Sequence, residues 1–152
     1  MPMRILILLP FVLFLSSCSS LLYYPSQQEF YQKRDLLYDI EELNFPDPVG
    51  NQINAWYFHA KNPKAKILFF HGNAQNLSAH FAMLSWLVDH NYDLMIFDYP
   101  GYGKSTGAPT PESTVLSGVE ALKKIEGINP SLPLFVYGQS LGGQIMQKSL
   151  NL

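Results

Sequence analysis

The sequence predicts an α/β fold in which an antiparallel hairpin leads into a mostly parallel sheet with flanking helices. Three short runs, 67–70, 94–97 and 134–137, are apolar or aromatic at every position, which is typical of strands buried on both faces. Segments with helical spacing of apolar residues separate these runs. Because strands that alternate with helical crossovers form parallel sheets, this order predicts the fold class.

Composition sets the broad class. A chain of 152 residues that is 47% hydrophobic and 14% charged, with a net charge of −2, fits one domain with a substantial core. No basic excess is present to attract nucleic acid, so that partner class is not expected. The single cysteine excludes an internal disulfide framework and a cysteine-cluster metal site. The spacing of histidines and carboxylates predicts no metal ion, and no cofactor is expected. The sequence does not indicate an oligomeric state.

Residues 1–17 have the layout of a secretory signal peptide. A short positive start precedes the apolar run 5–15, which is too short to span a bilayer at roughly 20 residues. The tetrapeptide Leu15-Ser16-Ser17-Cys18 resembles the lipobox of bacterial lipoproteins, which implies export and lipidation of Cys18. Ser19 after the cysteine resembles the sorting pattern for the periplasmic face of the outer membrane. Simple secretion and an uncleaved anchor are the alternatives.

We expect residues 18–35 to be a tether and residues 36–152 to form the domain. The domain begins with two strands, 37–45 and 53–59, joined by a turn that contains prolines and a glycine. These two strands form the predicted antiparallel hairpin.

Two helices are expected between the buried strands. The first spans about 77–90 after an N-cap at Asn76, and the second begins at Pro111 and ends near Gly127. The core faces follow from the spacing of the apolar residues. They comprise Leu77, Phe81, Leu84 and Val88 in the first helix, and Val115, Val119, Leu122 and Ile125 in the second.

The pentapeptide 138–142 matches the pattern G-x-S-x-G directly after a strand and before a helix, the context that this nucleophile motif requires. A sharp turn from strand to helix presses backbone against backbone, so Gly138 and Gly142 leave room that a side chain would fill. Ser140 at the apex would point its hydroxyl into open space. The N–H groups that follow lie at a helix N-terminus, where they can stabilise an oxyanion.

The two preceding buried strands also end in motifs. His71-Gly72-Asn73 follows the first, and the segment 98–105 follows the second with the pattern D-x-x-G-x-G-x-S. Together with the elbow, these motifs resemble those of the α/β-hydrolase superfamily, in its esterase-like and serine-peptidase-like branch. The resemblance extends over residues 37–147 and implies that the chain is the N-terminal half of that fold.

The resemblance implies a role for each motif residue. Ser140 would be the nucleophile, and the backbone N–H groups of Asn73 and Leu141 would hold the oxyanion of a small acyl substrate. The other motif residues are implied to shape the site rather than to react: His71, Gly72, Asp98, Gly101, Gly103, Gly138 and Gly142.

Residues 98–105, called the glycine loop below, partly match two nucleotide-binding motifs. Each motif requires a glycine at one position where this sequence has another residue. Gly103-Lys104-Ser105 imitates the end of a P-loop, but the first glycine would stand at position 98, which is Asp98. For G-x-G-x-x-G, the third glycine would be at position 106, which is Thr106.

The catalytic triad of α/β-hydrolases runs in the order Ser, Asp or Glu, His along the chain. Residues 141–152 contain no Asp, Glu or His. Two hypotheses follow. The chain is the N-terminal part of a lipid-anchored serine hydrolase for carboxylic esters or related acyl compounds, and is inactive by itself. Alternatively, it is a non-catalytic lipoprotein fragment or a truncated gene product.

Overall fold

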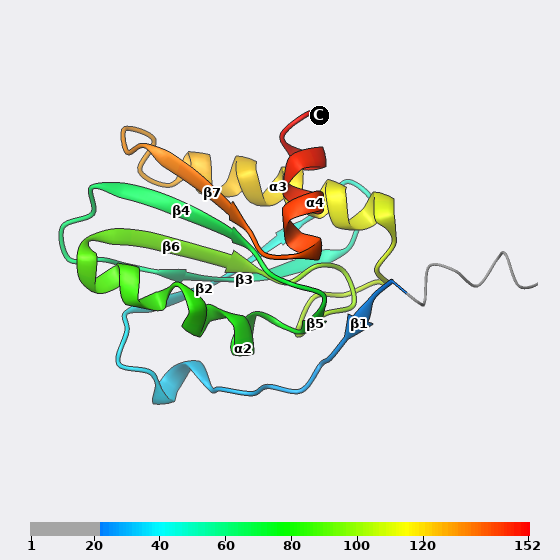
Figure 1. Cartoon of the computed structure of the whole chain (residues 1–152), viewed down its shortest axis with the longest axis horizontal. Helices are drawn as coiled ribbons and strands as arrows, with labels where there is room; N and C mark the ends of the chain where they lie inside the picture. Colours follow the sequence, from blue (N-terminus) through cyan, green and yellow to red (C-terminus); the bar gives the residue numbers. More distant parts are fainter. Residues whose placement is uncertain (1–21) are drawn as a thin grey trace, which may run out of the picture.

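The computed structural model describes residues 22–152, which form three layers with a sheet in the middle (Figure 1). The predicted signal peptide and Cys18 lie outside these residues. The sheet has five strands in the order β2-β3-β6-β4-β7. Their bounds are Ile40–Pro46 for β2, Gln52–Phe58 for β3, Ala65–Phe70 for β4, Tyr92–Phe97 for β6 and Leu134–Gly138 for β7.

The pairing of the strands confirms the predicted fold class. The hairpin strands β2 and β3 are antiparallel, and β3 is antiparallel to β6. β4 lies between β6 and β7 and is parallel to both. The first strand begins at Ile40, later than the predicted residue 37, because Ile40 pairs with Phe58, the last residue of β3. Leu37 has no strand beside it and is fully exposed.

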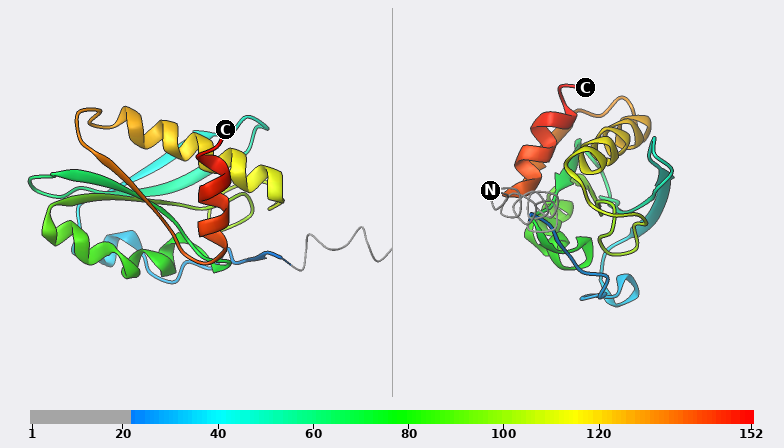
Figure 2. Two further views of the ribbon diagram at one scale, coloured as in Figure 1. Left: turned by 45° about the horizontal axis from the view of Figure 1, so that its top comes forward. Right: turned by 90° about the vertical axis from the view of Figure 1, so that its right-hand side faces the viewer.

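Helices cover both faces of the sheet (Figure 2). The helices α3 (Pro111–Gly127) and α4 (Leu141–Ser149) pack on one face. On the other lie α2 (Leu77–His80) and the 3-10 helices η3 (Phe81–Met83) and η4 (Ser85–His90). Alternate residues of β4 enter the two cores, and this two-sided burial explains why its sequence is apolar throughout.

The prediction of one continuous helix over 77–90 is wrong. A side chain bonds to a backbone carbonyl that would accept a backbone N–H in an α-helix: Trp86 Nε1 donates to the Met83 carbonyl at 3.1 Å. The Leu87 N–H, which would donate to Met83 in an α-helix, donates to Leu84 instead at 2.9 Å. The tighter winding keeps the predicted apolar stripe facing the sheet, with Leu84 half-buried and the other three residues buried: Leu77, Phe81 and Val88.

Both predicted helix starts are confirmed. Asn76 Oδ1 accepts a hydrogen bond from the Ser78 N–H at 3.0 Å. The second helix begins at Pro111 after an N-cap at Thr110, whose hydroxyl accepts from the Ser113 N–H at 3.0 Å. Its core face is as predicted, with Val115, Leu122 and Ile125 buried and Val119 half-buried.

The second helix ends at Gly127, as predicted, and a lysine from the neighbouring strand completes its C-terminus. Lys66 is 1% exposed, and its ammonium group donates to the carbonyl oxygens of Ile125 at 2.8 Å and Ile128 at 2.6 Å. A cation suits this end of a helix, where the last carbonyls lack partners. Burial lowers the pKa of Lys66, and the nearby carboxylates of Glu126 and Asp93 oppose that shift.

The described part of the predicted tether, from Leu22 onward, runs along the edge where the parallel strands end. Its two-residue strand β1 (Tyr24–Pro25) pairs in parallel with β5 (Ala74–Gln75). Within residues 22–152, no helix combines the length and the apolar character that crossing a bilayer requires.

Replacing Lys66 with Met should destabilise the domain, because the carbonyls of Ile125 and Ile128 lose a charged donor in a buried place. We expect the free energy of unfolding to fall by about 2–4 kcal/mol in equilibrium urea denaturation of the whole chain. Lys61→Met, at an exposed position, is the matched control and should stay within about 0.5 kcal/mol of the parent chain. Equal stabilities of the two variants would contradict the capping role.

Candidate active site

Ser140 lies at the apex of the turn between β7 and α4, at the edge of the sheet where the parallel strands end (Figure 1). Its backbone has φ 52° and ψ −119°, a conformation that a residue with a side chain rarely adopts. Strain of this kind costs about 1–3 kcal/mol and persists where surrounding contacts impose it. The residue is exposed, so its hydroxyl is accessible from solvent.

The glycines on either side of Ser140 allow the turn to pack closely. A Cβ at Gly138 would lie 2.5 Å from the Cα of Gly143. A Cβ at Gly142 would overlap the carbonyl oxygens of Phe70 and His71, at the end of β4. The Gln139 N–H donates to the Phe70 carbonyl at 3.0 Å and fastens the same contact. The elbow therefore rests on the turn that contains His71, Gly72 and Asn73.

Two backbone donors face no acceptor in this arrangement. Leu141 is the first residue of α4, so its N–H has no partner within the helix. Among residues 22–152, no group accepts a hydrogen bond from the N–H of Leu141 or of Asn73. The close contact of Gly142 with Phe70 and His71 places the start of α4 against the turn that leads to Asn73.

Hydrogen bonds from distant residues hold the turn after β4. The side chain of Asn73 accepts from the Tyr24 N–H at 3.0 Å and from the Tyr102 hydroxyl at 2.9 Å. The Tyr99 hydroxyl donates to the His71 carbonyl at 2.9 Å. Burial raises the pKa of Tyr102 to about 12, so its hydroxyl stays protonated and able to donate at neutral pH.

His71 and Asp98, predicted to be structural, lie beneath the turn. The His71 ring is 0% exposed, and its Nδ1 lies 2.7 Å from the Gly72 carbonyl. That carbonyl can only accept, so Nδ1 carries the proton. Nε2 lies 3.4 Å from Asp98 Oδ1, which also accepts from the Leu77 N–H at 2.7 Å. In the predicted glycine loop, Gly101 and Gly103 have positive φ angles of 82° and 50°, and Gly103 packs against the Asp98 carboxylate.

His80, which was not among the predicted site residues, connects the elbow to the turn after β4. Its Nε2 lies 2.7 Å from the Ala74 carbonyl and its Nδ1 lies 3.1 Å from the side-chain amide of Gln139. Its ring stacks on that of His71 with the centroids 5.1 Å apart. Burial lowers the pKa of His80, so the ring is neutral at pH 7. The only sequence signal is that His80 is one helical turn after Asn76.

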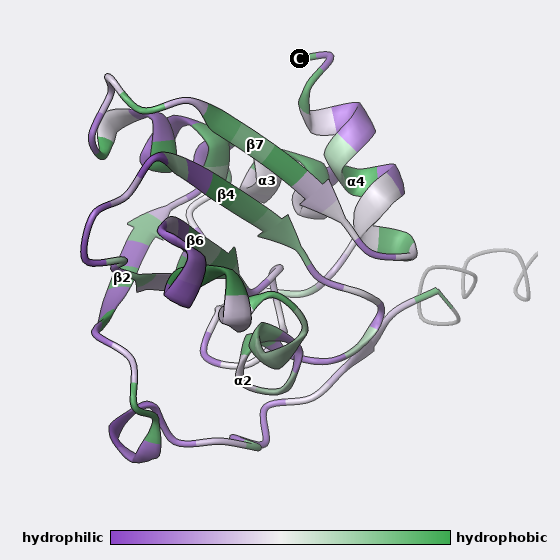
Figure 3. Cartoon of the chain, turned by 60° about the vertical axis from the view of Figure 1, so that its left-hand side comes forward, coloured by the Kyte–Doolittle hydropathy of each residue, from purple (hydrophilic) through white to green (hydrophobic). Residues whose placement is uncertain are grey.

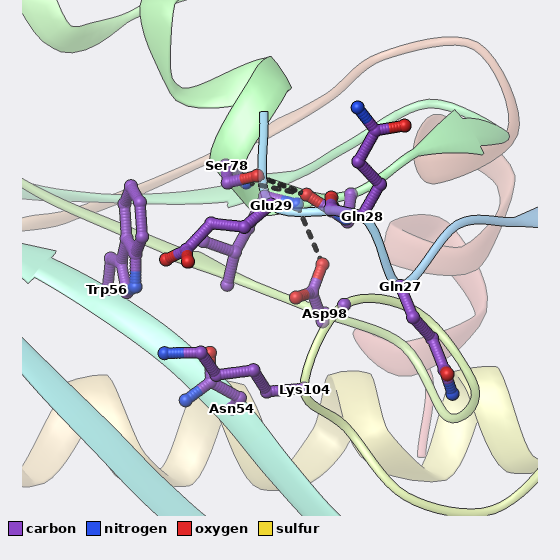
Figure 4. Close-up of a pocket in the computed structure, with 11 residues that line it drawn as sticks. Gln27, Gln28, Glu29, Asn54, Trp56, Ser78, Asp98 and Lys104 are labelled. Carbon is purple, nitrogen blue, oxygen red and sulfur yellow. Dashed lines mark hydrogen bonds between the residues drawn. The ribbon is translucent and has the colours of Figure 1, made fainter. Parts of the chain in front are cut away.

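A separate cavity of about 140 Å³ opens beside Asp98, beneath residues 27–29 (Figure 4). None of Ser140, Asn73 and Leu141 lines it. The buried Trp56 Nε1 at its wall has no hydrogen-bond acceptor among residues 22–152. In the same part of the chain, no three His, Cys, Asp or Glu side chains gather as a metal site would require.

The chain is similar in sequence to known proteins. Residues 61–151 match the family described as serine aminopeptidase, S33. The chain is 33% identical to the uncharacterized protein YfhR of Escherichia coli (strain K12) over 127 residues, 75% of this chain and 44% of YfhR. It is 35% identical to the α/β hydrolase domain-containing protein 17B of Homo sapiens over 99 residues, 61% of this chain and 34% of that protein. The chain thus spans less than half the length of these relatives.

Solved structures agree on the fold. The Pyrococcus furiosus esterase Pf2001 superposes with a TM-score of 0.70 at 18% identity, covering 85% of this chain and 52% of the esterase. A thermostable carboxyl esterase from Bacillus coagulans has a TM-score of 0.65 at 20% identity, covering 72% of this chain and 39% of that enzyme. Because the family match extends over more than half of the chain, the chain belongs to the serine aminopeptidase S33 family of α/β hydrolases.

Proposed function

We propose that this chain carries the nucleophile and the oxyanion site of a lipid-anchored serine hydrolase for carboxylic esters or related acyl compounds. The observation that supports it most is the strained, exposed Ser140, which is followed directly by the Leu141 N–H at the start of α4. A structural turn alone has no need of such strain, which is concentrated at functional sites. The named esterases of the same fold are consistent with this activity.

The proposed reaction is acyl transfer to Ser140. The hydroxyl oxygen bonds to the ester carbonyl carbon while its proton passes to a base, and the carbonyl oxygen takes up negative charge. The N–H groups of Asn73 and Leu141 donate to that oxyanion. Collapse breaks the bond to the alcohol oxygen, which leaves with the proton. Water then attacks the acyl-enzyme and releases the carboxylic acid and free Ser140.

The base and its acidic partner have to come from residues other than 141–152, which contain no Asp, Glu or His. The histidines near the elbow are occupied: His71 is fully buried, and His80 contacts Ala74 and Gln139. A serine hydroxyl without a base is a poor nucleophile at neutral pH. We therefore propose that the 152-residue chain is inactive by itself and requires these two groups to complete its site.

The cellular location is proposed from the sequence. Lipidation of Cys18 after export would hold the protein at the periplasmic face of the outer membrane. Attachment through more than one acyl chain makes such an anchor stable.

A fluorophosphonate probe, which labels activated serines, tests the proposed site. We expect no labelling of the 152-residue chain alone, and labelling of Ser140 when excess imidazole supplies the base. The oxyanion donors provide the remaining activation, which in serine proteases gives roughly 10³–10⁴-fold catalysis over water. Labelling is measured by mass spectrometry of the modified peptide.

Two serine variants complete this test. Ser140→Ala should abolish the imidazole-dependent labelling, whereas Ser131→Ala, at an exposed serine before β7, should retain it. Labelling that survives in Ser140→Ala, or none with imidazole present, would favour the non-catalytic alternative.

His80 predicts a pH dependence of stability. Its pKa in the folded chain is below the ordinary 6.5, so the unfolded chain binds the proton at higher pH. The stabilisation is complete above pH 6.5 and is lost as the pH falls through the lowered folded value. We expect His80→Gln to flatten the decline in unfolding free energy between pH 7 and pH 5, measured by urea denaturation. The exposed His90→Gln variant should keep the parent profile; an unchanged profile in His80→Gln would refute the assignment.

A further inference from the structure

The described chain enters the domain beside the proposed site. Leu22 and Tyr23 border a groove whose other wall includes Leu141, the residue after the proposed nucleophile. The next residue, Tyr24, donates its N–H to the side chain of Asn73 at 3.0 Å. In Figure 1 this N-terminal segment leaves from the same edge of the sheet at which β4, β6 and β7 end.

The entering segment is fastened to that edge over several residues. The Ser26 carbonyl accepts from the Gly103 N–H at 2.9 Å and from Asn76 Nδ2 at 2.8 Å. Asn76 Nδ2 also contacts the Gln28 carbonyl at 2.7 Å, and the Phe30 N–H donates to Ser78 Oγ at 3.0 Å. Because these bonds are spread along residues 26–30, the segment cannot swing away without breaking most of them.

Chain length then limits how far the domain can be from a lipid at Cys18. Cys18 is four positions before Leu22, and a fully extended chain of four residue steps spans at most about 14 Å. The six residues of β4 span about 20 Å between the amino ends of the parallel strands (the amino edge) and their carboxyl ends (the carboxyl edge). A lipid anchor at Cys18 therefore lies within reach of the carboxyl edge and cannot extend past the amino edge.

The two edges also differ in their exposed side chains. At the carboxyl edge, Leu22 and Tyr24 are 54% and 60% exposed, and an exposed tyrosine suits the boundary between acyl chains and water. The loops at the amino ends of the parallel strands carry mostly polar exposed residues and are drawn largely in purple in Figure 3, with the fully exposed Leu37 beside them. Examples are Lys61, Asn91 and Asn129.

We propose that the anchored protein turns its carboxyl edge, with Ser140 and the Asn73 turn, toward the bilayer surface. Its substrate would be an acyl ester of a membrane lipid. The ester bonds of such lipids lie at the boundary between acyl chains and water, which is the layer that the carboxyl edge would face. This inference rests on the proposed lipid anchor and on the proposed acyl transfer to Ser140.

Fluorescence quenching in vesicles tests the orientation. Lipidation blocks the Cys18 thiol, so a single introduced cysteine accepts a thiol-reactive fluorophore selectively. We would label Gln144→Cys on α4 and Ser131→Cys before β7, both exposed, and reconstitute each full-length lipidated protein into phosphatidylethanolamine–phosphatidylglycerol vesicles with headgroup spin-labelled lipid. Since the sheet edges are about 20 Å apart, quenching at 144 should exceed that at 131 at least about threefold.

A spacer variant provides the matched control. Twenty Gly/Ser residues inserted after Ser20 reach about 25 Å on average, which frees the domain from the surface. We expect this insertion to equalise quenching at the two positions. With imidazole present, it should also reduce labelling of Ser140 by a vesicle-embedded long-chain fluorophosphonate, but not by a water-soluble one.

The outcomes separate the proposals. Equal quenching at the two positions of the native-length protein, or stronger quenching at 131, overturns the orientation. Vesicle-embedded probe labelling that is insensitive to the spacer overturns the membrane-lipid substrate. Protein that fails to float with the vesicles overturns the anchor, and with it the orientation. Absence of labelling by the soluble probe instead contradicts the proposed function.

Discussion

The close backbone contact between the elbow and the end of β4 is the constraint on which the site depends. Gly142 has no side chain to separate the two segments, so it lies against the carbonyls of Phe70 and His71. This contact, with the hydrogen bond from the Gln139 N–H to Phe70, imposes the positive φ angle of Ser140. It also sets the start of α4 beside the turn after β4. Any side chain at Gly142 would push these segments apart.

The turn after β4 is stabilised from several directions, and this support comes from residues far apart in sequence. Tyr99 and Tyr102 bond to it from the loop after β6, and His80 joins it to Gln139. The N-terminal segment contributes through the Tyr24 N–H. A segment expected to be only a tether therefore contacts the turn that contains Asn73 directly. That contact makes the path from Cys18 to the site short, and the proposed orientation at a bilayer follows from it.

Among the described strands, β7 forms one edge of the sheet and pairs only with β4. The prediction that residues 134–137 form a strand buried on both faces is wrong: Phe135 and Tyr137 are 57% and 43% exposed, because no described strand lies on the other side of β7. An apolar edge of this kind is a template for further pairing. The esterase Pf2001 is covered to only 52% by this chain.

The sequence by itself determined the types and order of most elements and the elbow, whereas the oxyanion pair is implied only by the resemblance to the α/β-hydrolase superfamily. These features depend on local patterns: buried strands read as apolar runs, caps as single residues before a helix, and the elbow as glycines around Ser140. The tertiary structure alone decided the roles of Lys66, His80 and Tyr24. Each bonds to residues that no local period relates to it, such as His80 and Gln139, which are 59 positions apart. It also decided whether the segment after Asn76 winds as an α-helix or as 3-10 helices. Both helix types bury the same apolar stripe here, and they differ in which donors bond to the backbone carbonyls.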